Sequence, residues 1–530
     1  MTSAAPLPPF LSPPPEAVLT NAFSDAFNNA VATARTCYAP RVISAEDVAK
    51  DERAREIRDR IAREIYTAGH HTTLQHATFQ FAMTNVSRQL LWSFLHAHPF
   101  YNSEQVSQRY VEVKPGNALV PQLPARELGL YRATLDRQQA AYHELCEILL
   151  APTEAEYFRL FPGRRKAREK WVGVVKKKAQ EIARYVLPVA TFAHLYHTVS
   201  GLTLHRYHRL CNSLELPDEL RLLVRSMVAA VEQIDPLFFR EIEEPLPIDA
   251  TPEHALLMEL GAGDKVGGDR ARRFTAEFDA SLGGRSSKLV DYKVNSEAVL
   301  ADSIRATVGL TRSQLSDAEA IRRVLSPERN KLFAQSLTLT TLSKSTRALS
   351  HPHYTFRKKL SHTADSQDQR HRMVPGSRPM LAAHYAGGEP DAVLPDLIAR
   401  SPQALEVYQR TLLETFGAID SLLDAGIAAP SALYLLPNAF PIRFEESGDL
   451  LHLHHKWTSR LCYTAQEEIW RASLEEVRQV REVHPLIGEQ LMPPCTLRHA
   501  AGVRPTCPEG PRYCGVPVWR LELNQYERLI

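Results

Sequence analysis

Residues 71–111 read HTTLQHATFQFAMTNVSRQLLWSFLHAHPFYNSEQVSQRYV. Within this stretch, residues 77–87 alternate apolar and polar side chains, which predicts a strand. Residues 87–98 then return to the spacing of a helix. Residues 96–110, which follow that helix, form the densest polar segment of the first half of the chain. The stretch therefore predicts a strand, a helix and a ligand-facing loop in direct succession.

The chain around this stretch is long enough for more than one domain. It has 530 residues, of which 44% are hydrophobic and 23% charged, so it can form complete hydrophobic cores. Residues 51–69 show the amphipathic pattern of a helix, and residues 127–240 continue with helical spacing. A segment rich in Pro, Asp, Gly and Arg at about 245–285 predicts a linker.

The order of predicted elements recurs beyond the linker. Residues 286–294 predict a strand, residues 296–309 a helix and residues 336–345 another strand. A basic segment at residues 355–372 then leads into a second long helical region. Placing the Gln-Arg-Tyr of residues 108–110 over the Gln-Arg-His of residues 369–371 supports a repeat.

The fold class predicted from this repeat is α+β, with two tandem related units that each combine a small sheet with long helices. The alternative is two unrelated mixed domains. The predicted domains are a Pro-rich arm (1–17), a first unit (18–245), a linker (246–286), a second unit (287–485) and a Cys-rich C-terminal tail (486–530).

Charge and hydropathy narrow the classes of partner. Lys and Arg number 63 against 61 Asp and Glu, so the net charge of +2 gives no overall field that would hold nucleic acid. The basic stretch at residues 163–180 is better interpreted as a solvated helix face than as a nucleic-acid site. No apolar run approaches the roughly 20 residues of a membrane helix. We therefore predict a cytoplasmic protein with no nucleic-acid or membrane partner.

Seven cysteines are too few for a disulfide framework in a chain of this length. Three of them gather near the C-terminus around one histidine, but their spacing lacks the paired C-x2-C of a strong zinc motif. We predict no metal site. The alternative is a zinc site made of Cys495, His499, Cys507 and Cys514.

The polar loop of the opening stretch carries the groups that a nucleotide needs. Arg109 and Ser107 suit a phosphate, and Glu104 and Gln105 suit the polar edges of a sugar and a base. On composition alone, a solvated loop with one surface ion pair is the better interpretation.

The opening stretch resembles the signature region of the flavin-dependent thymidylate synthases. That family has a His before a strand, a helix that opens in Ser-Arg and runs into Arg-His-Arg, and then Ser-x-Arg-Tyr. ATARTCY at residues 32–38, ARYVLP at residues 183–188 and residues 197–221 also match family motifs in the right order. The resemblance covers about residues 18–240 and, more faintly, about 287–485.

The resemblance implies an enzyme that methylates dUMP to dTMP, with FAD as cofactor and methylene-tetrahydrofolate and NADPH as co-substrates. The protein would supply binding, orientation and electrostatics, whereas the cofactor would carry the difficult chemistry. Members of the family resemble homotetramers with sites between subunits, so a tandem chain is expected to form a homodimer. The alternatives are a catalytically silent nucleotide- or flavin-binding relative and an enzyme for another pyrimidine modification.

Transfer of the family motifs implies a set of site residues. Arg460 corresponds to the arginine that activates the uracil, a position that Cys211 occupies in the first unit. The expected substrate-binding residues are Glu104, Gln105, Ser107, Arg109, Arg184 and Arg370. The expected cofactor-binding residues are His76, His96, His98, Ser200, Arg357, Lys358 and Lys359.

Each unit lacks part of the family pattern, and the losses are complementary. His96-Ala97-His98 replaces Arg-His-Arg in the first unit, and the overlay of residues 108–110 on 369–371 assigns that role to Arg357-Lys358-Lys359 in the second. In the second unit Leu433 replaces the arginine that precedes Leu-Pro. We therefore predict one site shared between the two units.

Overall fold

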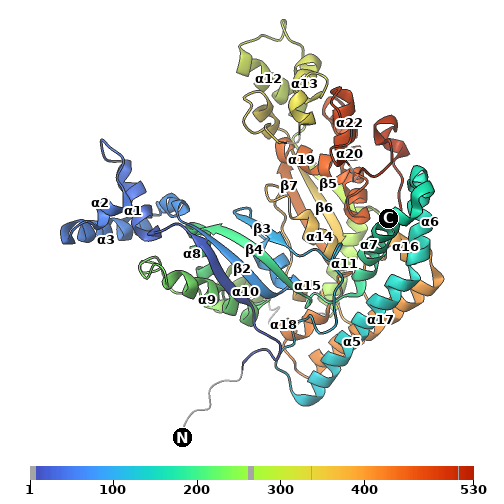
Figure 1. The fold of residues 1–530 in the computed structure, drawn as a ribbon, viewed down its shortest axis with the longest axis horizontal. Coiled ribbons are helices and arrows are strands. Elements are labelled where there is room, and N and C mark those ends of the chain that lie inside the picture. The colour runs from blue at the N-terminus through green and yellow to red at the C-terminus, as the bar shows by residue number, and fades with distance from the viewer. Residues whose placement is uncertain (1–7, 261–267, 336, 511–512) are drawn as a thin grey trace.

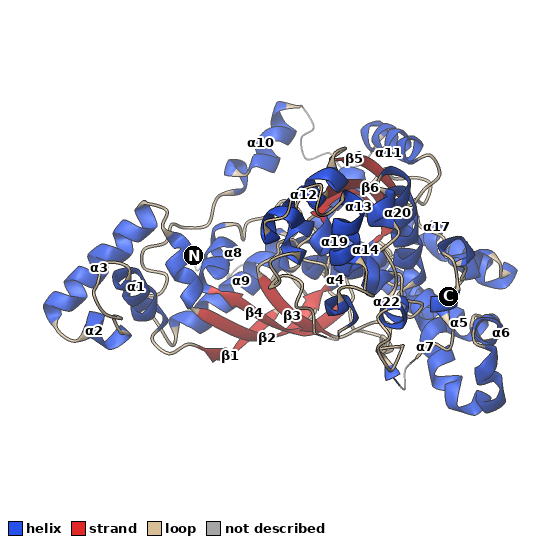
Figure 2. Ribbon diagram, turned by 90° about the horizontal axis from the view of Figure 1, so that it is seen from above, coloured by secondary structure: helices blue, strands red, loops and turns tan. Residues whose placement is uncertain are grey.

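The computed structural model describes residues 8–260, 268–335, 337–510 and 513–530. Its strands form two separate antiparallel sheets, which Figure 2 shows in red, with orders β1-β2-β4-β3 and β5-β6-β7. The strands are β1 (Glu16–Ala22), β2 (Thr78–Ser87), β3 (Tyr101–Gln105), β4 (Phe192–Ser200), β5 (Ser287–Tyr292), β6 (His353–Ser361) and β7 (Pro441–Asp449).

Helices pack around both sheets, so the fold is α+β as predicted (Figure 1). Those that precede β5 are α1 (Ala26–Thr36), α2 (Ala45–Ala49), α3 (Glu52–Thr67), α4 (Arg88–Leu90), α5 (Ala125–Ile148), α6 (Leu150–Leu160), α7 (Val172–Ala183), α8 (Gly201–Arg209), α9 (Pro217–Glu232), α10 (Pro252–Glu259) and α11 (Asp269–Leu282). Those that follow β5 are α12 (Ser296–Val308), α13 (Asp317–Leu325), α14 (His362–Asp368), α15 (Leu381–His384), α16 (Asp396–Ala399), α17 (Pro402–Asp424), α18 (Ala429–Ala432), α19 (Leu450–Arg460), α20 (Glu467–Val483), α21 (Pro485–Gly488) and α22 (Pro494–Ala500). None of these described helices is long and apolar enough to cross a membrane.

Several predicted elements are confirmed. The strand expected at residues 77–87 is β2, and the amphipathic helix at residues 51–69 is α3. Beyond the linker, the strand at residues 286–294 is β5 and the helix at residues 296–309 is α12. The predicted linker itself contains α10 and α11.

Two expectations about elements were wrong, and a third, the helix at residues 87–98, was right in kind but too long. The helical stretch at residues 127–240 is interrupted by β4, whose alternating buried side chains gave a signal that helical spacing on either side obscured. The helix expected at residues 87–98 is α4 followed by a π-helical turn, Leu91–Leu95. No strand forms among the described residues of the segment 336–345, of which residue 336 lies outside the description; the strand is β6 instead, within the basic segment.

The basic segment can form a central strand because its one inward-facing charge is neutralised. Tyr354, Phe356, Lys358 and Leu360 of β6 all point to one buried face. The Lys358 ammonium lies 2.6 Å from the carboxylate of Asp368 and 3.1 Å from a second carboxylate, that of Glu446. A lysine at an inward position breaks the apolar alternation by which a strand is recognised in a sequence. Buried charge is rare unless it is paired, so the pattern alone did not predict this strand.

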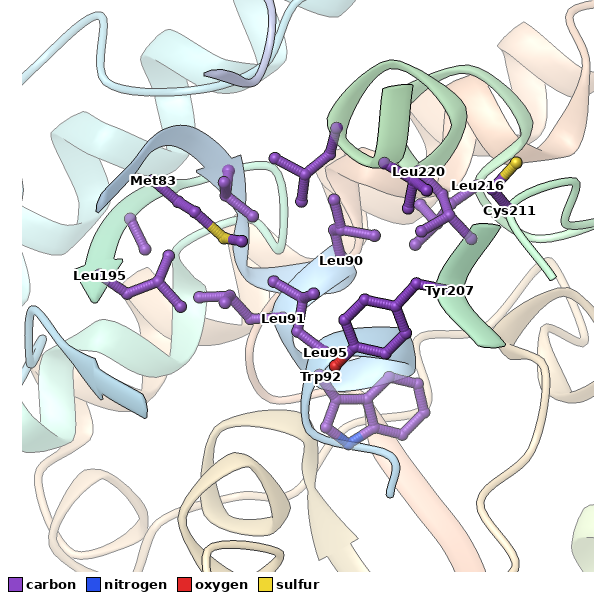
Figure 3. Close-up of a cluster of buried hydrophobic side chains, with 14 of the residues drawn as sticks. Met83, Leu90, Leu91, Trp92, Leu95, Leu195, Tyr207, Cys211, Leu216 and Leu220 are labelled. Carbon is purple, nitrogen blue, oxygen red and sulfur yellow. The ribbon is translucent and has the colours of Figure 1, made fainter. Parts of the chain in front are cut away.

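The opening stretch of the sequence lies at the centre of the first half. Figure 3 shows Leu90, Leu91 and Leu95, from α4 and the π-helical turn, between Met83 and Leu195 of the sheet and the side chains of α9. All of these residues belong to one hydrophobic core, which also includes residues of the second half such as Leu433–Leu436. Burial of large apolar side chains, at roughly 1.5–3 kcal/mol each, therefore holds the two halves together.

A buried carboxyl group joins the two halves at their centre. Glu219 of α9 accepts hydrogen bonds from the backbone N–H and the hydroxyl of Ser87, at 2.7 and 2.6 Å, and from the hydroxyl of Tyr434 in the second half, at 2.6 Å. The second half repeats the arrangement around Glu468, which accepts hydrogen bonds from the backbone N–H and hydroxyl of Ser361. The third donor is the hydroxyl of Tyr185, from the first half. Each half therefore completes a buried hydrogen-bond network of the other.

The Glu219 network makes stability depend on pH. Burial raises the pKa of Glu219 to about 7 despite the three hydrogen bonds it accepts. Because the folded pKa exceeds the unfolded value of about 4.3, this group's stabilising contribution is complete at low pH and is lost as pH rises toward 7. We expect Glu219→Gln to reduce the fall in unfolding free energy between about pH 5 and pH 7.5. Urea unfolding at both pH values, with exposed Glu46→Gln as control, measures this; an unchanged pH dependence in Glu219→Gln contradicts it.

Candidate functional site

A cavity of about 150 Å³ lies between the two halves. It contains four arginines, and none of its described lining residues is acidic. The first half contributes Arg88, Gln105, Ser107, Gln108, Arg109 and Arg184; the second half contributes Thr363, Ser366, Gln367, Arg370 and Asn438. Guanidinium, amide and hydroxyl groups gathered without a carboxylate form a site for a polar anion.

The polar loop after β3 enters this cavity because its own backbone and side chains fold it back. The Ser107 hydroxyl accepts a hydrogen bond from the Arg109 N–H at 3.2 Å. The Arg109 guanidinium is held on one side by the carboxylate of Glu181 and on the other by the carbonyl of Thr464, at 2.9 Å. Arg109 is thus fixed by both halves of the chain.

Arg184 and Arg88 line the cavity and have N–H donors without acceptors in the described part of the chain. Arg184 follows α7 and is 3% exposed, yet its Nε and Nη2 have no hydrogen-bond partner in the described part of the chain. Arg88 begins α4, and its Nε likewise lacks a partner there. Burial, and secondarily the charge of Arg184, lowers the pKa of Arg88 to about 9. Buried donors without acceptors are costly, so a bound anion would stabilise this cluster.

Two further arginines of the second half lie at the cavity. Arg370 lines it and donates to the carbonyl of Ser103 on β3 at 2.6 Å. Arg460, the last residue of α19, donates to the carbonyl of Gln367 at 2.7 Å and lies directly behind this lining residue. Burial lowers the pKa of Arg460; the charge of Asp368 opposes this shift, and those of Arg109 and Arg370 add to it. Five arginines therefore lie in or beside the cavity.

Some residues of the predicted set lie elsewhere. Gln105, Ser107, Arg109, Arg184 and Arg370 line one cavity, with Arg460 beside it. Glu104 is exposed on β3, and His76 is exposed just before β2. The Ser200 hydroxyl caps α8 by accepting from the N–H of Thr203 at 3.3 Å. These three side chains do not join the cavity.

His96 and His98 belong to an aromatic cluster rather than to the cavity. The His96 ring stacks on Tyr101 with centroids 4.9 Å apart, and His98 Nε2 lies 2.6 Å from the hydroxyl of Tyr207. Burial lowers the pKa of His96 well below its usual value and that of His98 to about 4. Both imidazoles are therefore uncharged at neutral pH and do not replace arginines.

The structure corrects the overlay of the two halves. Ser87 and Ser361 occupy the same position, since each ends a strand, caps the following helix and bonds a buried glutamate. Counting onward from each serine places Arg370-His371-Arg372, not Arg357-Lys358-Lys359, opposite His96-Ala97-His98. The literal Arg-His-Arg string of residues 370–372 is the signal in the sequence that could have identified this segment, and the earlier overlay did not use it.

The three residues of the earlier overlay point away from the cavity. All three belong to β6, where Lys358 is fully buried among carboxylates. Arg357 pairs with Glu445 on the neighbouring strand, and Lys359 pairs with Asp279. Because their charges are already neutralised, these side chains are poor candidates for holding a cofactor.

Sequence reasoning missed six lining residues. Arg88 is the arginine of the Ser-Arg that opens the helix, and Gln108 lies inside the quoted polar loop, so both carried a local signal. The other four carried none; they are Thr363, Ser366, Gln367 and Asn438. Asn438 reaches the site because its side chain donates to the carbonyl of Arg184 at 3.0 Å, a contact between the halves that the order of residues does not reveal.

No group of three or more His, Cys, Asp or Glu side chains among the described residues is arranged to hold a metal ion. His499, predicted as a possible ligand, stacks on Trp519 with ring centroids 6.0 Å apart. It therefore does not join the three C-terminal cysteines.

Comparison with known sequences identifies the family. The sequence model of the family described as thymidylate synthase complementing protein matches residues 18–237 and again residues 288–486. The chain belongs to this family. The prediction of a tandem, two-copy relative of the flavin-dependent thymidylate synthases is thereby confirmed, and the family implies an enzyme with a flavin cofactor.

Individual members of the thymidylate synthase complementing protein family match one part of the chain. The flavin-dependent thymidylate synthase of Clostridium tetani is 27% identical over 212 residues, which are 39% of this chain and 78% of the relative. That of Mycobacterium sp. (strain KMS) is 29% identical over 184 residues, or 34% and 68%. That of Geobacter sulfurreducens is 28% identical over 169 residues, or 32% and 70%.

Proposed function

We propose that this chain binds dUMP in the cavity between its halves and methylates it to dTMP. The observation that carries the proposal is the buried Arg184 guanidinium, whose free donors face a cavity built from both halves. Family membership and the relatives' printed names support a thymidylate synthase. FAD, methylene-tetrahydrofolate and NADPH complete the proposed reaction, in which the reduced flavin supplies the hydride.

The lining residues suit the parts of a pyrimidine monophosphate. Arg184, Arg88 and Ser107 would hold the phosphate through charge-assisted hydrogen bonds. Gln105 and Gln108 each have a side-chain atom without a partner in the described chain, Oε1 and Nε2 respectively, and these suit the sugar and base. The amides can donate and accept, as a uracil edge requires.

Arg460 and Arg109 would provide the electrostatic part of the reaction. Their guanidinium groups lie near enough to oppose each other's charge, and both are largely removed from water. A uracil carbonyl in the cavity would be polarised by this field, which favours attack at the ring carbon that receives the new group. Fixed charges in a dry site act strongly because they need no reorientation during the reaction.

For the flavin, the best candidate in this chain is Arg372. It lies over the ring of Tyr101, 5.2 Å from the centroid, and donates to Asn102 at 3.0 Å. This half-buried cation beside the cavity suits a cofactor phosphate. A single arginine side chain cannot by itself bind a cofactor as large as FAD. We propose that a second copy of the chain completes it. Phe100 and Tyr196, 61% and 55% exposed near this segment, are apolar surface that such a partner would cover.

We further propose that the two halves are copies of one unit and that only one of their two equivalent sites is open. The proposed units are residues 18–245 and 287–485, joined by residues 246–286, with an N-terminal arm and a C-terminal tail. Leu433 stands where Arg184 stands in the other half. Trp92 fills the equivalent space and donates to Asp365 at 2.7 Å, and this carboxylate also neutralises Arg378. We therefore expect each chain to bind one dUMP.

A second candidate is a silent nucleotide-binding relative. It is favoured by His96 and His98, which carry no charge where the family has two arginines. Purified protein that shows flavin absorbance, and that restores growth to a host requiring thymidine, supports the enzyme. Protein that binds one dUMP per chain in calorimetry but holds no flavin and restores no growth supports the silent relative.

The position of Arg370 in the cavity lining makes its own prediction. We expect Arg370→Ala to weaken dUMP binding by about tenfold to a hundredfold, because one hydrogen bond to a charged group contributes roughly 1.5–3 kcal/mol. Arg357→Ala removes a surface ion pair away from the cavity and is expected to leave dUMP affinity unchanged. Isothermal titration with dUMP compares the two variants. An effect confined to Arg357→Ala would contradict the assignment of dUMP to this cavity.

A further inference from the structure

Four of the seven cysteines line a second cavity, of about 180 Å³. Cys462 lies in the loop after α19, Cys495 lies in α22, and Cys507 and Cys514 lie in the C-terminal segment. The remaining three cysteines lie outside this cavity. Sequence reasoning missed Cys462 because it is far from the tail in sequence.

The ordinary explanation for buried cysteines is that they fill space as small apolar side chains. That explanation does not fit a cavity that remains open with four thiols at its wall. A thiol cluster that converges on open space from three separate segments is instead typical of a site for a soft cation.

The four thiols also lie within electrostatic range of one another. Burial raises the pKa of Cys495 to about 12, and the other three thiols raise it further. Burial likewise raises the pKa of Cys514 to about 11, with contributions from Cys462 and Cys507. These mutual effects agree with the position of all four thiols around one cavity.

We propose that Cys462, Cys495, Cys507 and Cys514 form a structural zinc site. Binding replaces four S–H bonds by four Zn–S bonds, and the four protons pass to solvent, so no oxidant or reductant is needed. Zinc is favoured because four thiolates at tetrahedral positions are its usual structural ligand set. As they stand, the thiols are not gathered at bonding distance, so their side chains must rotate into the cavity.

The site would fix a loop that contacts the nucleotide cavity. Cys462 lies between Arg460 and Thr464, whose carbonyl accepts from Arg109. The tail already holds this loop from its other end, since Arg528 donates to the carbonyls of Tyr463 and Ala465 at 2.9 and 2.8 Å. The proposed zinc site thus gives the C-terminal tail a positioning role for the arginines of the nucleotide cavity.

The test uses the full chain, purified without metal-affinity steps from cells grown with added zinc. We expect elemental analysis to find about one zinc per chain. Cys462→Ser and Cys507→Ser should lose most of it, whereas Cys146→Ser, which alters a half-buried cysteine outside the cavity, should retain it. Wild-type protein without zinc, or full zinc retention in both cavity variants, would overturn the proposal.

Cobalt substitution and thiol counting keep the test independent of how well the variants fold. Wild-type chain exchanged with Co²⁺ is expected to show thiolate-to-metal charge transfer and the intense visible bands of a tetrahedral ion. All seven cysteines should react as free thiols after denaturation without reductant. Loss of reactive thiols in pairs would show disulfides and refute the zinc site. Neither measurement depends on dUMP, so the zinc site and the proposed function can fail separately.

Discussion

Arg184→Met is expected to lower the affinity for dUMP by at least about a hundredfold, because it removes two or more charge-assisted hydrogen bonds of roughly 1.5–3 kcal/mol each. The ligand-free protein should be no less stable. Burial lowers the pKa of Arg184 more than the carboxylate of Glu181 raises it, and its Nε and Nη2 have no partner in the described chain. Isothermal titration with dUMP and urea unfolding of the ligand-free chain measure the two effects.

Arg443→Met is the matched control. Arg443 is also buried, but its guanidinium is satisfied by Asp279 at 2.8 Å and Asp391 at 2.7 Å, away from the cavity. This variant is expected to lose stability and keep dUMP affinity, which is the opposite pattern. If Arg184→Met instead lowers the free energy of unfolding and leaves dUMP affinity unchanged, Arg184 is a structural residue and the cavity is not the nucleotide site.

Lys358→Met is expected to lower the free energy of unfolding by about 3–5 kcal/mol, because removal of one partner from a buried ion cluster leaves the remaining charges buried and unneutralised. The Lys358 ammonium lies 2.6 Å from Asp368 and 2.9 Å from Glu476. Lys456 is the only other described cation that pairs within this cluster. Loss of one lysine leaves three carboxylates to share one ammonium group.

The neighbouring residue provides the control. Lys359→Met removes an ion pair with Asp279 in which the lysine side chain is 28% exposed, so its cost should stay within about 1 kcal/mol. Urea unfolding of both variants at neutral pH gives the comparison. Equal effects would show that the Lys358 cluster contributes no more than a surface ion pair.

Local patterns in the sequence predicted elements well where side-chain chemistry agreed with burial. The alternation of residues 77–87 yielded β2, because its inward side chains are apolar. The same analysis failed for β6, because Lys358 occupies an inward position that is tolerated through its ion pairs with carboxylates outside the strand. These are Asp368, Glu446 and Glu476. Buried charge depends on tertiary partners, and periodicity cannot anticipate them.

The candidate site likewise contains some residues that sequence motifs predicted and others that they did not. Ser107, Arg109 and Arg184 were found through family motifs and do share one cavity. The contributions of Asn438 and Cys462 depend on contacts across long stretches of chain, which no local spacing encodes. The error in the overlay of the halves came from aligning a strand with a loop, and the shared Ser–Glu hydrogen bonds corrected it.

Arg184 and Leu433 begin equivalent short helices in the two halves, yet separate codons specify them. In an assembly of identical subunits, one nucleotide change would remove that arginine from every copy at once, and selection would eliminate the change. If the two halves are copies of one unit, as proposed, a chain that carries both escapes this coupling. One pocket would be free to be filled by Trp92 and to serve as scaffold, while purifying selection would act on the other alone.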